Sequence, residues 1–158
     1  MKNVVLARID ERLIHGQVAT QWLKMVNANT ILVVDEKIPT DSFMTMVLQA
    51  VCPRNCKLHL LTPADAVTFL DGEPGTEKIF IVTKGPEAML AMVEGGCQFK
   101  EVILGNMGGA PNRKAFNRNV SASESEAQCF KDIIAKGVPF YQQMVPTDSK
   151  VDVQSLLK

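Results

Sequence analysis

The densest group of chemically active side chains lies near the amino terminus, in residues 8–16 (Arg-Ile-Asp-Glu-Arg-Leu-Ile-His-Gly). Arg8, Asp10 and Arg12 alternate, so a locally extended chain would place their side chains on one side. His15 follows directly. A histidine beside two fixed cations is poorly suited to bind a metal ion and well suited to meet an anion. The pattern therefore predicts a phosphate site.

His15 is the candidate nucleophile of this segment, because a neutral imidazole can attack a phosphoryl group without a separate base. Phosphoryl transfer depends on positioning and charge stabilisation, and the guanidinium fork of Arg12 matches the equatorial oxygens of the transferred group. Gly16 and Gln17 open the following helix, where a missing Cβ would let phosphate approach the backbone amides. Asp10 would hold an arginine or the imidazole in place.

The same residues allow two other interpretations. Arg8, Asp10 and Arg12 could form a purely structural salt-bridged loop that caps the first helix. The loop could also belong to a non-catalytic, flavodoxin-like module that binds a nucleotide or a sugar phosphate reversibly. A response-regulator site is disfavoured, because the third predicted strand ends in Leu61-Thr62 and not in an aspartate. The sequence contains no P-loop motif of the kinase type.

Short apolar runs alternate with amphipathic segments along the whole chain, which predicts strands alternating with helices. The expected strands are residues 4–7, 30–34, 57–61, 78–82, 101–104, a short one near Val120, and 138–145. The expected helices are residues 17–27, a segment after Pro39, 63–70, 86–94, one opened by Ser123-x-x-Glu126 and ended by Gly137, and a terminal one capped by Ser149-x-x-Asp152.

This alternation predicts an α/β fold with an open, mostly parallel, doubly wound sheet of six or seven strands and helices on both faces. Such sheets bind ligands outside the carboxyl ends of their strands. The loops to search are therefore residues 8–16, 35–39, 62–63, 83–86 and 105–116.

Composition narrows the class of protein further. A chain of 158 residues predicts one domain, and its net charge of zero argues against a nucleic-acid partner. No apolar run approaches the ~18 residues of a membrane span, and the first residues lack a secretory signal, so we expect a cytoplasmic protein. The four cysteines are expected to stay reduced as small apolar residues. The two histidines are not spaced for zinc, so neither a metal nor a cofactor is expected.

Four residues at the same predicted edge have a weaker claim to function. In loop 105–116, two glycines precede Arg113 and Lys114, which could approach an anion or simply form a solvated turn. Thr62 and Lys84 both precede helices, and we interpret both as caps. None of the four is included in the predicted site.

Helix 40–51 and the second histidine are given structural interpretations. The helix carries Phe43, Met44, Met46 and Leu48 around more than one face, and we expect most of these residues to pack in the core. A partner-docking surface is the alternative, because methionine adapts to varied shapes. His59 lies between two leucines of a predicted strand, so we interpret it as structural or solvent-facing.

Residues 8–17 (Arg-x-Asp-x-Arg-Leu-Ile-His-Gly-Gln) closely resemble a family signature. It is the amino-terminal signature of the IIB components of the phosphoenolpyruvate-dependent sugar phosphotransferase system, mannose/sorbose/fructose/N-acetylgalactosamine class. The resemblance continues through Ala28-Asn29, Val33-Val34-Asp35, Gly105-Asn-Met107, and Gly137-Val138 to Gln143 and Val145-Pro146. Residues 108–114 depart from the family's pattern.

The resemblance implies a single sorbose/mannose-type IIB domain over residues 1–158. It implies that His15 accepts a phosphoryl group on Nδ1 from a histidine of a phosphorylated IIA protein or domain. His15 would then pass the group to a sugar carried by the membrane IIC and IID components. The expected catalytic residues are His15, Arg12 and Asp10, and the expected phosphate-binding residues are Arg8, Gly16 and Gln17. The protein would be cytoplasmic, peripherally associated with the membrane permease, and Gly105-Asn-Met107 favours its amino-sugar relatives.

Overall fold

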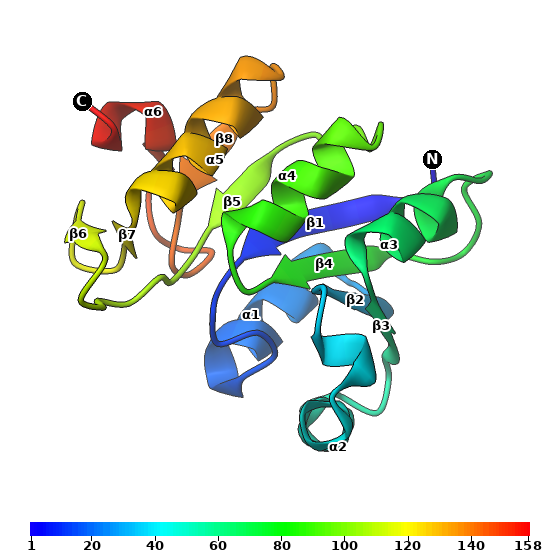
Figure 1. The fold of residues 1–158 in the computed structure, drawn as a ribbon. Helices are drawn as coiled ribbons and strands as arrows, with labels where there is room; N and C mark the ends of the chain where they lie inside the picture. The colour runs from blue at the N-terminus through cyan, green and yellow to red at the C-terminus, as the bar shows by residue number, and fades with distance from the viewer.

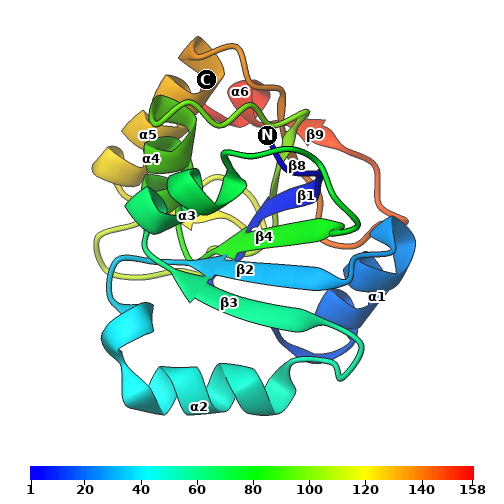
Figure 2. The ribbon, with the colours of Figure 1, turned by 90° about the vertical axis from the view of Figure 1, so that its right-hand side faces the viewer.

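The computed structural model describes residues 1–158, with the exception of the side chains of Gln17 and Val18. Its main sheet has seven strands in the order β3-β2-β4-β1-β5-β8-β9 (Figures 1 and 2). The six parallel strands are β1 (Val4–Ile9), β2 (Thr30–Val34), β3 (Lys57–Leu61), β4 (Ile79–Thr83), β5 (Val102–Leu104) and β8 (Phe140–Gln142). Strand β9 (Val151–Asp152) pairs antiparallel with β8 at one edge. A separate antiparallel ribbon joins β6 (Lys114–Ala115) to β7 (Ser121–Ala122).

Helices cover both faces of this sheet (Figures 1 and 2). They are α1 (Gly16–Val26), α2 (Ser42–Val51), α3 (Pro63–Leu70), α4 (Pro86–Glu94), α5 (Glu124–Ala135) and α6 (Val153–Leu156), with a 3-10 turn η1 (Ile38–Thr40) before α2. The predicted open, mostly parallel, doubly wound α/β fold is confirmed.

The strand residues divide between two hydrophobic cores because successive side chains of a strand point to opposite faces. Every residue of β2 is buried. Ile31 and Val33 belong to the core that contains Trp22 of α1, whereas Leu32 and Val34 belong to the core under α3, α4 and α5. This two-sided burial explains why the central strands are continuous apolar runs in the sequence.

The local helix signals are confirmed in three places. Thr62 caps α3 by accepting a hydrogen bond from the Asp65 amide. Ser123 and Glu126 form the predicted capping box of α5. Gly137 follows the end of α5 with φ of +84°, a left-handed conformation that L side chains rarely adopt.

Three predictions at the ends of elements are wrong. The terminal helix is capped by Asp152, which accepts from the Gln154 amide, and not by Ser149, because Val151 and Asp152 first pair with β8. The predicted strand 138–145 is paired with its neighbours only over Phe140–Gln142. The residues after it instead turn over the site, as described below. Lys84 is exposed and is not a cap, since Gly85 occupies the N-cap position of α4.

The core prediction for helix α2 is also wrong in part. Leu48 is buried, but Phe43 is 65% exposed and Met46 is 61% exposed. Helix α2 lies beside the β3 edge of the sheet (Figure 2), so only one of its sides has a neighbour to pack against. His59 is half-buried in β3 with its ring 4.8 Å from that of Phe69, which fits the structural interpretation.

Candidate active site

Residues 10–15 form the loop between β1 and α1, at the carboxyl end of the sheet's central strand. Strand β1 has β4 on one side and β5 on the other. The chain leaves β1 for α1 on one face of the sheet, whereas α4, which connects β4 to β5, lies on the opposite face. Such a switch in direction leaves a crevice at the carboxyl edge, the usual ligand site of this architecture. The predicted segment therefore stands where the fold places ligands.

Asp10 is the centre of the site and binds both arginines; we call Arg8, Asp10 and Arg12 the inner ion cluster. Its Oδ1 accepts hydrogen bonds from the Arg12 amide at 3.1 Å and from Arg12 Nε at 2.9 Å. Its Oδ2 accepts from Arg12 Nη2 at 2.8 Å and from Arg8 Nη2 at 3.2 Å. Burial alone would raise the pKa of Asp10. The hydrogen bonds from Arg12, with the charges of Arg8 and Arg12, instead hold that pKa below its usual range.

Arg8 lies inside the protein, with its side chain 2% exposed. Its Nη1 donates to the Gln143 carbonyl at 2.9 Å and its Nη2 to the Met144 carbonyl at 2.9 Å. Its guanidinium also stacks on Trp22, 4.8 Å from the ring centroid. Burial lowers the pKa of Arg8, and the Asp10 carboxylate opposes that shift. These contacts tie the chain that follows β8 to the site, which explains why that strand ends early.

Arg12 differs from Arg8 in its exposure. Its Nε and Nη2 donate hydrogen bonds to Asp10, yet 30% of its side chain remains exposed. Its hydrogen bond to Asp10 raises the pKa of Arg12, so this guanidinium keeps its charge. A cation that is anchored on one side and open on the other is suited to meet an incoming anion.

His15 is the N-cap residue of α1, with extended φ and ψ of −151° and 140°. Its carbonyl accepts from the Ala19 amide at 3.2 Å. Its side chain is half-buried and makes no capping hydrogen bond to the helix. His15 therefore lies at the positive end of the α1 dipole, and its imidazole satisfies none of the free backbone amides there.

Two residues around His15 have left-handed backbone. Gly16 has φ of +47°, and nothing lies within 4 Å of the position its Cβ would occupy, so conformation and not space explains this glycine. Leu13 has φ of +59° although it is not a glycine, and its side chain is buried. Gln17, which the sequence placed at the phosphate, has a side chain outside the described residues.

Gly105, after β5, is a site residue whose role the sequence did not show. A Cβ there would lie 2.6 Å from Arg8 Cζ and 2.8 Å from Asp10 Oδ2. Only a residue without a side chain therefore lets β5 pass the inner ion cluster. Arg113 does not face an open anion site, because its guanidinium pairs with Glu11 and Glu126. The interpretation as a solvated turn fits better, since the Arg113 amide donates to the Ala110 carbonyl at 3.0 Å across exposed residues. Lys114 beside it is exposed.

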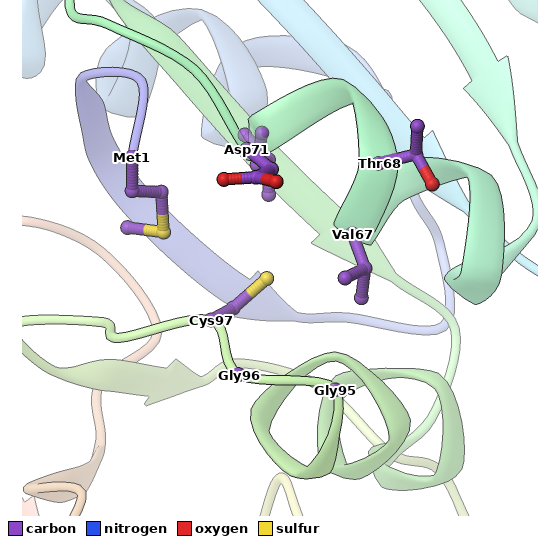
Figure 3. Close-up of a pocket in the computed structure, with 8 residues that line it drawn as sticks. Met1, Val67, Thr68, Asp71, Gly95, Gly96 and Cys97 are labelled. Carbon is purple, nitrogen blue, oxygen red and sulfur yellow. The ribbon is translucent and has the colours of Figure 1, made fainter.

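A cavity of about 320 Å³ lies away from this loop, beside Met1 at the amino end of β1 (Figure 3). It is lined by Met1, by Val67 and Asp71 at the end of α3, and by Gly95 and Cys97 after α4.

All four cysteines are free, and burial raises the pKa of each thiol. Among the described residues, His, Cys, Asp and Glu side chains form no group of three or more that could bind a metal ion. The helices of the described chain are also too short or too polar to span a bilayer.

Fold and site together describe an α/β domain with a histidine and two arginines at the carboxyl end of its central strand. Comparisons with known proteins show its family. The family model of the PTS system sorbose subfamily IIB component matches residues 4–158. The N-acetylgalactosamine-specific phosphotransferase enzyme IIB component 2 of Escherichia coli (strain K12) is 32% identical over 157 residues, which cover 99% of this chain and 100% of that protein.

Two further relatives extend the comparison. The crystal structure of the IIBSor domain of the sorbose permease from Klebsiella pneumoniae superposes with a TM-score of 0.91 at 28% identity, covering 98% of this chain and 96% of that chain. The mannose-specific EIIAB component of Escherichia coli (strain K12) is 31% identical over 153 residues. That alignment covers 96% of this chain and 47% of the longer EIIAB protein.

The chain belongs to the sorbose subfamily of PTS IIB components. It is therefore a phosphotransferase of the sugar phosphotransferase system, which takes a phosphoryl group from IIA and delivers it to a sugar. Components of this kind work with IIA and membrane components. Family membership decides between the two functions that the sequence left open, in favour of phosphoryl transfer over reversible binding of a nucleotide or sugar phosphate.

Proposed function

We propose that His15 is the residue that carries the phosphoryl group. The observation that supports this most strongly is the position of His15 at the N-terminus of α1, three residues after an arginine whose guanidinium is anchored on Asp10 yet remains partly exposed. Nδ1 of His15 attacks the phosphorus of the donor's phosphohistidine, and the donor's N–P bond breaks as the new N–P bond forms. A sugar hydroxyl oxygen then attacks the phosphorus on His15, so that an O–P bond forms as the His15 N–P bond breaks, and the hydroxyl proton passes to the released imidazole.

The residues of the loop have separate roles in this proposal. Arg12 faces the charge on the transferring phosphoryl oxygens, since it is the arginine that solvent reaches. Asp10 fixes Arg12 through three hydrogen bonds. Arg8, which the sequence analysis counted among the phosphate-binding residues, has a different role in this proposal: it is buried, donates to Asp10 and two carbonyls, and supports the loop from inside. Gly16 supplies the left-handed turn that opens α1, with Gln17 next to it at the phosphate.

The experiment that tests the assignment is phosphorylation by a phosphorylated IIA protein of the mannose class, followed by mass analysis of the labelled peptide. We expect an acid-labile, base-stable phosphate on His15 and none in His15→Ala. His59→Ala is the matched control, because His59 lies in β3 and packs against Phe69 of α3, so its loss should leave labelling intact. Retained labelling in His15→Ala would overturn the assignment.

We further propose that the whole chain acts as one IIB unit in the cytoplasm, docked peripherally on membrane IIC and IID components. The donor must bring its phosphohistidine to His15, so its footprint should surround loops 8–16, 35–39 and 105–116. Chemical-shift mapping with the IIA protein tests this, and a footprint on the opposite edge of the sheet would contradict it. Supplying the labelled protein to membranes that carry different IIC/IID pairs identifies the sugar, with an amino sugar such as N-acetylgalactosamine tested first.

A further inference from the structure

A second group of charges holds the active loop from the outside; we call Glu11, Arg113 and Glu126 the outer ion cluster. Arg113 Nε and Nη2 donate to Glu126 Oε1 and Oε2 at 2.9 and 2.8 Å. Arg113 Nη1 donates to Glu11 Oε2 at 3.0 Å and to the Gly108 carbonyl at 2.8 Å. One guanidinium thus uses three nitrogens to join two carboxylates from distant parts of the chain.

Each carboxylate of the outer ion cluster is also attached to backbone. Glu126 Oε1 accepts from the Ser123 amide at 2.9 Å, which fixes it to the start of α5. Glu11 Oε1 accepts from the Gly108 amide at 2.6 Å. The Glu11 amide in turn donates to the Asn106 carbonyl at 3.0 Å. A continuous series of short hydrogen bonds therefore runs from a helix end to the active loop.

The loop is consequently fixed at two successive residues. Asp10 is held by the inner ion cluster and Glu11 by the outer one, and Arg12 follows immediately. The buried Leu13 then adopts its left-handed φ of +59°, a conformation that costs energy in a non-glycine residue. Such a conformation persists only where surrounding contacts over-determine it, and the two clusters supply those contacts.

We propose that Arg113 is a positioning residue for phosphoryl transfer, acting through Glu11 to hold the loop that presents Arg12 and His15. The inference rests on the proposed function of His15. Residues 108–114 depart from the pattern of the family that the chain otherwise resembles, so this role does not follow from the resemblance. Transfer is sensitive to misplacement of the reacting groups, so a loosened loop should slow the chemical step more than it weakens donor binding.

Rapid-quench measurement of single-turnover transfer, over a range of concentrations of phosphorylated IIA protein, separates these two effects. For Arg113→Met we expect the saturating rate to fall about tenfold while the half-saturating IIA concentration changes by less than about threefold. Arg113→Lys should recover part of the rate, because a point charge reaches one carboxylate without the fork. Lys114→Met removes the same charge from the adjacent exposed residue and should keep the saturating rate within about twofold.

Hydrogen exchange of the Arg12 to Gly16 amides gives an independent readout. Exchange in this loop should quicken in Arg113→Met and not in Lys114→Met. Should Arg113→Met fail to fold, Glu11→Gln replaces it, since the amide keeps an acceptor for the Gly108 amide while losing the charge opposite Arg113. It should lower the saturating rate in the same direction.

Three outcomes would overturn the proposal. A folded Arg113→Met with an unchanged saturating rate would do so, as would an equal loss of rate in Lys114→Met, which would indicate a general charge effect. A rise in the half-saturating concentration alone would assign Arg113 to donor binding. Each of these leaves His15 as the labelled residue. A label elsewhere on the unaltered protein would instead overturn the proposed function and this inference with it.

Discussion

The inner and outer ion clusters hold the same loop with opposite compositions. The inner cluster places two arginines on one aspartate, Asp10, and its formal charge is +1. The outer cluster places one arginine, Arg113, on two glutamates, and its formal charge is −1. The surplus positive charge therefore lies in the cluster that leads directly to His15. Arg113, although it contacts the loop through Glu11, has no charge to spare for an anion.

Burial also separates the two clusters. The side chains of Arg8 and Asp10 are 2% and 3% exposed, whereas those of the outer cluster are between 12% and 32% exposed. Arg12 is the exception in the inner cluster, with 30% of its side chain exposed. A buried charge that loses its partner is left without solvent, but a partly exposed one is rehydrated. Changes in the inner cluster should therefore affect both the fold and the chemistry, and changes in the outer cluster chiefly the rate.

The largest effect on stability is expected at Asp10. Asp10→Ala leaves two arginines facing each other, one of them buried, and should lower the free energy of unfolding by about 3–5 kcal/mol. Glu11→Ala, one residue along, should cost only about 1 kcal/mol or less. Urea unfolding followed by circular dichroism measures both variants. Equal losses at the two positions would remove the distinction between the clusters.

The largest effect on rate short of losing His15 is expected at Arg12. Arg12→Ala should slow transfer about 10²-fold or more, the scale for losing one preorganised donor to developing charge. Arg12→Lys should recover part of the rate, because the bidentate fork is lost while the charge remains. Single-turnover assays with labelled IIA give these values. Unchanged kinetics in Arg12→Ala would move charge stabilisation to another part of the loop.

The fold and the position of the candidate site were predictable from the sequence, whereas the burial and the partners of each charged side chain were not. Alternation of apolar runs predicted the sheet, and Ser123 with Glu126 predicted a capping box, because both patterns act over a few residues. The sequence predicted that both Arg8 and Arg12 would contact the phosphate. Only the return of the chain after β8, with the carbonyls of Gln143 and Met144, makes one of them internal.

The same limit explains the residues that the sequence analysis missed or placed wrongly. Gly105 is needed because β5 passes the inner ion cluster, a contact between segments almost one hundred residues apart. Arg113 finds Glu11 across a similar separation. The apolar side chains of α2 predicted a core helix, but its place at the β3 edge leaves Phe43 and Met46 exposed. In each case the contacts or exposure of the residue depend on how segments distant in the sequence are arranged.

Low pH should destabilise the fold through both clusters, by less than the substitutions above, and a Glu126 variant should separate the two contributions. The pKa of Asp10 and that of Glu126 are both lowered in the folded protein, in each case against the opposing effect of burial, by arginine hydrogen bonds. Both carboxylates therefore stabilise the fold above their unfolded pKa values of about 4, and this stabilisation is lost as the pH falls through the lower folded values. Thermal melts below about pH 4 should show the loss. Glu126→Gln should remove part of this pH dependence and leave the rest, which belongs to Asp10; a melt profile identical to that of the unaltered protein would contradict this.

The smallest expected effect is that of a chelator, which should leave the transfer rate unchanged. A divalent cation needs oxygen ligands, and the carboxylates of the active loop are already engaged. Both oxygens of Asp10 accept hydrogen bonds from arginine, and those of Glu11 accept from the Gly108 amide and from Arg113. The inner cluster's surplus positive charge supplies what magnesium supplies in nucleotide-dependent transfer, so an added cation would be repelled from the same place. The rate should also fall as salt screens this charge over ~8–10 Å. Transfer measured with EDTA, with added Mg²⁺ and across a salt series tests both statements. A loss of rate on chelation that Mg²⁺ restores would show that a metal, and not Arg12, balances the phosphoryl charge.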